Sequence, residues 1–204
     1  DKRVYADVRK GTDVHSYTAS IIGCTRQEAK AHTFKPLYGG TTGTEDQKRY
    51  YNDFKDKYMG IAIWHETLQE DAVKYREISL PSGRVYAFPD ARWTKYGTAT
   101  HRTAICNYPV QGFATADLLP IALVALEKAV RDANIHSVIC NTVHDSIVMD
   151  VHPDEKNICI DLMKHAMLSL PFETVRRYGI TYNMPVGIEI KVGKNWLDLH
   201  DVEL

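Results

Sequence analysis

Two cations and two aromatic residues recur at every fourth position between residues 25 and 40: Arg26, Lys30, Phe34 and Tyr38. If this stretch is helical, all four side chains lie on one face. A nucleoside triphosphate has the matching chemistry, because its anionic tail accepts charge-assisted hydrogen bonds and its flat base needs an apolar or aromatic surface. The spacing therefore predicts a nucleotide-binding helix. The alternative is an ordinary amphipathic helix with snorkelling cations.

The flanking residues predict where this helix begins and ends. Thr25 and Glu28 form a capping-box pattern at its start, and a glycine pair beginning at Gly39 follows the last turn. Pro36 interrupts the pattern, since proline lacks a backbone donor and crowds the carbonyl four residues earlier. We therefore expect a helix over 26–38 that kinks or tightens just before this proline.

A second stretch, 141–151, predicts a tight β-hairpin with a carboxylate at its tip. Two apolar, β-branched runs flank His144 and Asp145, and apolar residues alternate from position 147 onward. A carboxylate held at the bend of two rigid strands is well placed to bind a metal ion. The alternative is an ordinary turn aspartate.

Five short motifs occur in order along the chain. They are Asp13-Val14-His15, the Arg26-x3-Lys30-x3-Phe34-x3-Tyr38-Gly39 helix, Asn107-x-Pro109-x-Gln111-Gly112, Val143-His144-Asp145 and Gly193-Lys194-Asn195-Trp196. In this order and spacing they resemble the family A DNA polymerases, relatives of bacterial DNA polymerase I and of phage-type enzymes. The resemblance covers essentially the whole chain.

The resemblance implies an α+β fold, namely the C-terminal part of a right-hand polymerase. We expect a mainly helical fingers portion over 1–104 and a palm portion with an antiparallel sheet over 105–204. The residue patterns predict helices near 2–10, 14–22, 26–38, 45–58, 61–75, 113–134 and 154–169, and strands near 77–80, 84–88 and 184–192 beside the hairpin. The stretch from 89 to 104 is expected to be irregular, and the helix over 113–134 to bend at Pro120.

The implied chemistry is DNA-directed DNA synthesis. A primer 3′-hydroxyl attacks the α-phosphate of a deoxynucleotide (dNTP), and pyrophosphate leaves. Enzymes of this kind use two metal ions, and hard oxygen ligands in octahedral geometry favour Mg²⁺. By resemblance, Asp145 is a catalytic, metal-binding carboxylate. Lys30 is the second catalytic residue and supplies a proton or positive charge to the leaving pyrophosphate.

The resemblance also implies roles for the substrate-binding residues. His15, Arg26 and Lys30 would hold the triphosphate. Their charges would stabilise it most strongly when the fingers close and exclude water. Phe34 would stack near the sugar and base, and its lack of a hydroxyl predicts discrimination against dideoxynucleotides. Tyr38 would pack at the base of the pocket.

Three further residues are expected to bind the primer-template. Asn107 and Gln111 would contact the minor-groove edge of the terminal base pairs, where acceptors report shape more than sequence. His144 would lie against the primer terminus. The alternative for Asn107 is a helix cap beside Pro109.

One family motif has no match here. The first catalytic aspartate of the family lies in an Asp-x-Ser-x-x-Glu-x-Arg strand some tens of residues before the Asp-x-His element, whereas twelve residues precede Asp13. We therefore expect a fragment that is inactive alone and needs an N-terminal palm and thumb polypeptide. The alternatives are one half of a split polymerase, or a non-catalytic nucleotide- or DNA-binding module.

Three positions depart from the family pattern. Ser146 stands where a glutamate is common, which weakens any claim for a further metal-side carboxylate. Thr103 stands where an arginine is frequent, with Arg102 one place out of register. The pair Lys35-Pro36 is phage-like, which suggests a viral enzyme acting in a bacterial cytoplasm.

Composition narrows the class of protein. With 204 residues, 44% hydrophobic and 25% charged, the chain can form a core and does not resemble a disordered protein. Four widely spaced cysteines favour reduced thiols over a disulfide framework. No uninterrupted apolar run predicts a membrane span. The net charge of −1 means that any DNA-binding charge must be local.

Overall fold

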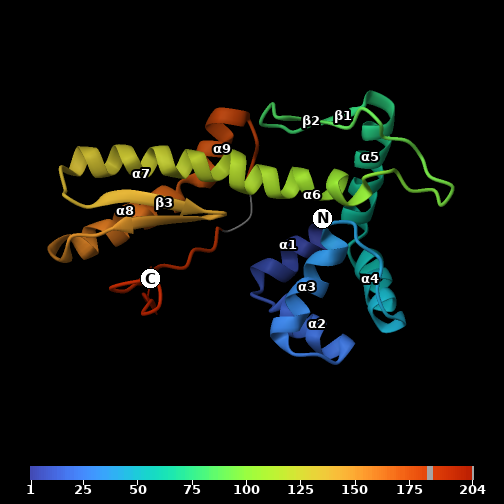
Figure 1. The fold of residues 1–204 in the computed structure, drawn as a ribbon, viewed down its shortest axis with the longest axis horizontal. Coiled ribbons are helices and arrows are strands. Elements are labelled where there is room, and N and C mark those ends of the chain that lie inside the picture. The colour runs from blue at the N-terminus through green and yellow to red at the C-terminus, as the bar shows by residue number, and fades with distance from the viewer. Residues whose placement is uncertain (183–185, 204) are drawn as a thin grey trace. The chain divides into compact units, whose positions relative to one another are not determined.

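The computed structural model describes residues 1–182 and 186–203. The chain divides into two compact units, Asp1–Gly112 and Phe113–Leu204. Most described residues are helical, and the strands form three separate two-stranded antiparallel sheets (Figure 1). The predicted α+β fold is confirmed. The division falls after Gly112 rather than after residue 104, and the assignment of the units to fingers and palm stays a prediction.

The first unit contains five helices, one short hairpin and a sixth helix. They are α1 (Lys2–Arg9), α2 (Val14–Ile22), α3 (Arg26–Leu37), α4 (Glu45–Lys57), α5 (Met59–Tyr75), β1 (Glu77–Ser79), β2 (Val85–Ala87) and α6 (Arg102–Gly112). The first five helices lie within two residues of their predicted ends. Local capping explains this agreement, because Thr25 and Thr44 each form a complete capping box at the start of their helices.

Buried hydroxyl groups hold α3 against its neighbours. Ala29, Thr33 and Pro36 form the buried row of α3. The Thr33 hydroxyl donates to Thr18 Oγ1 in α2 at 2.8 Å, and Thr18 Oγ1 lies 2.7 Å from the hydroxyl of Tyr50 in α4. Because these buried polar groups satisfy one another, they fix which face of α3 points inward.

A hydrophobic core joins α5, the β1–β2 hairpin and α6. Its buried members are Leu68, Ala72, Ile78, Phe88, Ala91, Ala99 and Ile105. Helix α6 was not predicted, because Pro109 and Gly112 break a helical sequence pattern. Burial of Ile105, Cys106 and Pro109 stabilises the helix despite these residues.

Among its described residues, the second unit contains a long helix, two shorter helices, two short helical turns and two antiparallel strand pairs. In order these are the π-helical turn η1 (Phe113–Leu118), α7 (Leu119–Ala133), β3 (Val138–Val143), β4 (Ser146–Asp150), the 3₁₀ turn η2 (Pro153–Glu155), α8 (Lys156–Leu168), α9 (Leu170–Tyr178), β5 (Lys191–Val192) and β6 (His200–Asp201). Its core packs Ile121 and Ala122 of α7 against Leu170 of α9, with Ile147 of β4 beside them.

Two predictions in this unit are wrong in detail. The helix predicted over 113–134 begins with the π-helical turn η1 and is α-helical only from Leu119, because Pro120 cannot donate to the fourth residue before it and a wider turn accommodates this gap. The strand near 184–192 is reduced to Lys191–Val192, since its partner β6 is equally short. Residues 184 and 185 of that prediction lie outside the described residues.

One helical stretch, Arg102–Ala133, is long and apolar enough to cross a bilayer by length and composition only. Core helices of soluble proteins meet the same criterion. Leu119, Ile121, Ala122 and Leu126 of this stretch are buried inside the second unit.

Candidate nucleotide-binding site

Helix α3 presents the predicted row of side chains to solvent. Arg26, Lys30 and Phe34 are exposed, and Tyr38 at its C-terminal cap is half-buried. The helix continues through Pro36, and its end is closed after the proline, where the amide of Gly39 donates to the Pro36 carbonyl at 3.1 Å and the amide of Gly40 to the Lys35 carbonyl at 2.8 Å. The predicted face therefore forms one continuous surface.

An ion pair orients Arg26. Its Nε lies 2.8 Å from Asp13 Oδ2. The other carboxylate oxygen, Asp13 Oδ1, caps α2 by accepting from the amides of His15 and Ser16. The Arg26 guanidinium, followed by the hydroxyl and amide of Ser16, holds the pKa of the Asp13 carboxyl well below its usual range. Helix α2 and the start of α3 thus share one carboxylate.

A row of rings runs from α2 along α3. His15 packs edge-on against Phe34, with ring centroids 5.3 Å apart, and Phe34 stacks on Tyr38 at 5.9 Å with an interplanar angle of 9°. The row ends at α6, where Gln111 Nε2 donates to the Tyr38 hydroxyl at 2.6 Å. This surface could receive a flat base or a sugar beside the two cations.

The surroundings of His15 disfavour its charged form. Burial lowers its pKa below the ordinary value, and the nearby charges of Arg26 and Lys30 lower it further, although Asp13 opposes them. Its Nδ1 atom is buried without a hydrogen-bond partner among the described residues. A neutral imidazole can hydrogen-bond a phosphate oxygen, but it adds no full positive charge.

The C-terminal end of α3 fits tightly against α6. Gly39 has φ +77°, and a Cβ at this position would lie 3.0 Å from Cys106 Sγ and 3.1 Å from Cys106 Cβ. Burial raises the pKa of the Cys106 thiol to about 11, so this cysteine is a packing residue in its protonated form. Glycine at position 39 therefore lets Tyr38 approach α6.

A buried histidine holds the same end from the other side. His65 of α5 is 3% exposed, and its Nε2 lies 3.0 Å from the Leu37 carbonyl. Burial lowers the pKa of His65 to about 4 despite this hydrogen bond, and the charges of Arg102 and Lys55 act in the same direction. His65 is thus a neutral anchor for a helix end that proline has weakened.

Two polar atoms on α6 are buried without hydrogen-bond partners among the described residues. They are Asn107 Oδ1 and Arg102 Nε. Buried polar atoms are normally satisfied, so an unpartnered acceptor on Asn107 is compatible with a ligand. The helix-cap alternative for Asn107 is wrong, because this residue lies inside α6.

The other two predicted residues lie in the second unit, at the tip of the β3–β4 hairpin. Val143 pairs with Ser146, which leaves His144 and Asp145 as a two-residue loop. His144 has φ +54°, as the first position of such tight turns requires, and histidine is among the residues that adopt positive φ more readily. Both side chains are exposed, as predicted from the sequence.

Glu155 fastens the opposite end of this hairpin. Its carboxylate accepts hydrogen bonds from the amides of His136 and Ser137 and from the Ser137 hydroxyl at 2.6 Å. These bonds, led by the hydroxyl, lower the pKa of Glu155 to about 2. Asp145 is therefore carried on a hairpin whose base is fixed.

A complete metal site is not formed by the residues that the structure describes. Asp145 offers the oxygen ligands that Mg²⁺ prefers. However, within 1–182 and 186–203 no group of three or more His, Cys, Asp or Glu side chains is arranged to hold a metal ion. Asp145 can supply one ligand here, and the others would have to come from elsewhere.

The structure thus brings six of the predicted residues into one surface of the first unit: His15, Arg26, Lys30, Phe34, Tyr38 and Gln111. Sequence reasoning missed Asp13 as the partner of Arg26. Aspartate directly before a helix is typical of a cap, but no local pattern indicates an ion pair with a residue on the next helix.

Comparison with a solved structure defines the class of fold. The POL domain of Pol1 from M. smegmatis, in complex with DNA primer-template and dNTP, has a TM-score of 0.66 with this chain. The likeness covers 79% of this chain and 32% of that chain, at 24% identity. At this identity it establishes the fold, which is that of a polymerase domain.

The family model for DNA polymerase family A matches residues 1–198. The chain belongs to this family. It is 27% identical over 220 residues to DNA polymerase I of Lactococcus lactis subsp. cremoris, covering 97% of this chain and 24% of the relative. It is 25% identical over 208 residues to DNA polymerase I of Mycobacterium tuberculosis, covering 91% and 22%. The chain therefore spans about a quarter of the length of these relatives.

Proposed function

We propose that this chain forms the dNTP- and primer-template-binding part of a DNA-directed DNA polymerase. One observation carries the proposal: the exposed face of α3 combines two cations with a row of rings that ends in a hydrogen bond to Gln111. Membership of DNA polymerase family A supports it. The bacterial relatives are compatible with a cytoplasmic location, and the phage-type origin stays a prediction.

In this proposal Arg26, Lys30 and His15 bind the triphosphate. The two cations contribute charge, while the neutral imidazole contributes a hydrogen bond. Lys30 is exposed and can approach a leaving pyrophosphate, whose developing charge it would stabilise. Phe34 receives the sugar and base, and Tyr38 closes the end of this surface.

The remaining roles concern DNA and metal. Asn107 and Gln111 would contact the terminal base pairs, and His144 the primer terminus. Asp145 would be one carboxylate ligand of Mg²⁺, an ion that supplies charge neutralisation and a lowered hydroxyl pKa when bound. Further metal ligands and turnover would, in this proposal, depend on an N-terminal palm and thumb polypeptide.

Nucleotide binding by the full 204-residue chain tests the first half of the proposal. Calorimetry with a dNTP should show that Lys30→Ala weakens binding by about tenfold or more, since charged hydrogen bonds contribute about 1.5–3 kcal/mol. Lys48→Ala is the matched control, because Lys48 is also an exposed lysine but pairs with Glu45 in α4 at 2.7 Å. Equal affinities of the two variants would remove Lys30 from the site.

Primer extension tests the second half. We expect no extension by the chain alone and Mg²⁺-dependent extension after addition of a palm and thumb polypeptide. Asp145→Ala should abolish extension, whereas Asp150→Ala, at the far end of β4 from the turn that carries Asp145, should preserve it. Vigorous synthesis by the isolated chain would contradict the expected need for a partner. If the chain binds dNTP but no extension occurs after the palm and thumb polypeptide is added, the alternative of a non-catalytic binding module would be favoured.

A further inference from the structure

A second surface with nucleic-acid chemistry lies outside the residues assigned above. Between Phe88 and α6 the chain forms a hairpin-like loop, in which Trp93 and Ala99 form an isolated antiparallel bridge. The segment 91–100 contains two cations and two aromatic rings but no acidic residue, although the whole chain carries a net charge of −1. We define its basic-aromatic tip as Arg92, Trp93, Lys95 and Tyr96.

The loop is firmly built. The amide of Thr94 donates to the Thr98 carbonyl at 2.8 Å, and the amide of Thr100 donates to the Arg92 carbonyl at 2.9 Å. Its base enters the core through Ala91 and Ala99, and the Ala99 amide donates to Gln69 Oε1 at 3.1 Å. The tip is therefore presented on a fixed support.

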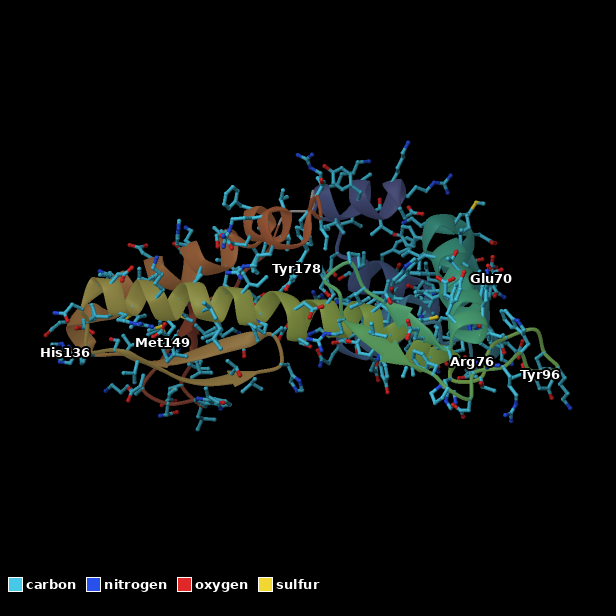
Figure 2. The ribbon with its side chains drawn as sticks, turned by 90° about the horizontal axis from the view of Figure 1, so that it is seen from above. Glu70, Arg76, Tyr96, His136, Met149 and Tyr178 are labelled. Atoms are coloured by element: carbon cyan, nitrogen blue, oxygen red, sulfur yellow. The ribbon has the colours of Figure 1, made fainter. Side chains whose placement is uncertain are left out.

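The side chains of the tip nevertheless face solvent. Tyr96 is 79% exposed and Trp93 48% exposed, and Arg92 and Lys95 are exposed as well. Figure 2 shows Tyr96 at the outer end of the loop, directed away from the helices of the first unit. Lys95 Nζ lies 5.0 Å from the centroid of the Tyr96 ring. Single exposed aromatic residues are common, but two of them beside two cations on one rigid loop are not explained by folding.

The nearest carboxylate in the sequence does not neutralise these cations fully. Asp90 lies 3.0 Å from His101 Nε2 at the base of the loop. An anionic partner would therefore meet Arg92 and Lys95 together with the exposed rings of Trp93 and Tyr96. Nucleic acid has this combination of phosphates and bases.

We propose that the basic-aromatic tip binds single-stranded DNA, in the proposed reaction the unpaired part of the template. This inference rests on the proposed polymerase function. Rings can stack on bases only where the base faces are accessible, which excludes the interior of a duplex. Two cations on a narrow loop can contact the phosphates of a flexible single strand, whereas a generic duplex site usually needs a broader basic surface.

The test uses Trp93 itself as the probe. In the full chain with Trp64→Phe and Trp196→Phe, Trp93 is the remaining tryptophan. Titration with an oligo(dT) strand should quench its fluorescence, and a hairpin duplex of equal length should quench it less. Absence of quenching by oligo(dT), or stronger quenching by the duplex, would overturn the proposal.

Two variants separate stacking from charge. Tyr96→Ala should weaken oligo(dT) binding by about fivefold or more without changing its salt dependence, because one stacked base contributes about 1–3 kcal/mol. Lys95→Ala should reduce the slope of log affinity against log salt by about 0.7. Lys74→Ala with Tyr75→Ala is the matched control, since Lys74 lies over the exposed Tyr75 ring at 4.7 Å. An equal loss in this control would overturn the assignment to the tip.

A second readout separates this inference from the polymerase proposal. Tyr96→Ala and Lys95→Ala should leave Lys30-dependent dNTP binding and the melting temperature unchanged, because both side chains are exposed. Loss of dNTP binding only on Lys30→Ala, with Trp93 unquenched by oligo(dT), would leave the proposed function standing and overturn the tip. Absence of Lys30-dependent dNTP binding would instead overturn the proposed function.

Discussion

Gln111 Nε2 donates a hydrogen bond to the Tyr38 hydroxyl at 2.6 Å and so connects the end of α3 to α6 across 73 positions of sequence. The resemblance implied that Tyr38 packs in the nucleotide pocket and that Gln111 contacts DNA. The hydrogen bond gives these two proposed functions a shared contact. A substitution at either residue is therefore expected to alter the position of the other side chain.

Replacing Tyr38 by phenylalanine should measure this connection. The variant keeps the ring that stacks on Phe34 but removes the acceptor hydroxyl. The free energy of unfolding should fall by about 0.5–1 kcal/mol, as for a partly exposed hydrogen bond, and urea denaturation would show it. Tyr96→Phe, at a 79% exposed tyrosine, should change nothing. An unaltered urea midpoint for Tyr38→Phe would show that the bond does not stabilise the fold.

Replacing Gly39 by alanine should strain the end of α3. Alanine at positive φ costs about 1–2 kcal/mol, and its Cβ would also press on Cys106. Gly11→Ala is the matched control, because Gly11 has φ +68° but a Cβ added there would meet open space. We expect the larger loss of unfolding free energy for Gly39→Ala, with partial recovery when Cys106→Ala removes Sγ. Equal losses at both glycines would contradict the close fit.

Replacing Asp13 by asparagine should free Arg26 for anions. Asparagine can still cap α2, but it no longer holds the guanidinium by charge. The affinity for dNTP should rise severalfold at low salt, and the gain should shrink as salt screens the site. Asp46→Asn is the control, because Asp46 pairs with Arg49 on α4 at 2.9 Å. Weaker dNTP binding by Asp13→Asn would show that Asp13 positions Arg26 productively.

The anchor at His65 predicts a pH dependence of stability. Its pKa is about 4 in the folded chain against an ordinary 6.5, so the unfolded chain takes up a proton first as the pH falls. The free energy of unfolding should be undiminished above pH 6.5 and should fall by up to about 3 kcal/mol toward pH 4. Denaturation of His65→Gln at several pH values should show a flatter profile, while the exposed His200→Gln should match the parent. An unchanged slope in His65→Gln would place the acid sensitivity elsewhere.

Local chemistry explains which elements could be predicted. The capping boxes at Thr25 and Thr44 act within three residues, and the two-residue turn at His144 and Asp145 is defined by its immediate neighbours. Helix α6 could not be recognised, because its stability comes from burying Ile105 and Cys106 against distant segments. The π-helical turn before Pro120 could not be predicted either, since a proline indicates that the helix is distorted but not whether it bends or widens into a π-turn.

The sequence by itself determined the face of α3, through side chains repeated at helical spacing, and the hairpin tip that carries Asp145. Only the tertiary structure decided that Asp13 holds Arg26, that Gln111 reaches Tyr38 and that His65 anchors Leu37. Residue spacing encodes contacts within one helix or turn, because the backbone geometry there is regular. Contacts between helices depend on how buried groups such as Thr18, Thr33 and Cys106 pack, and no local pattern records that.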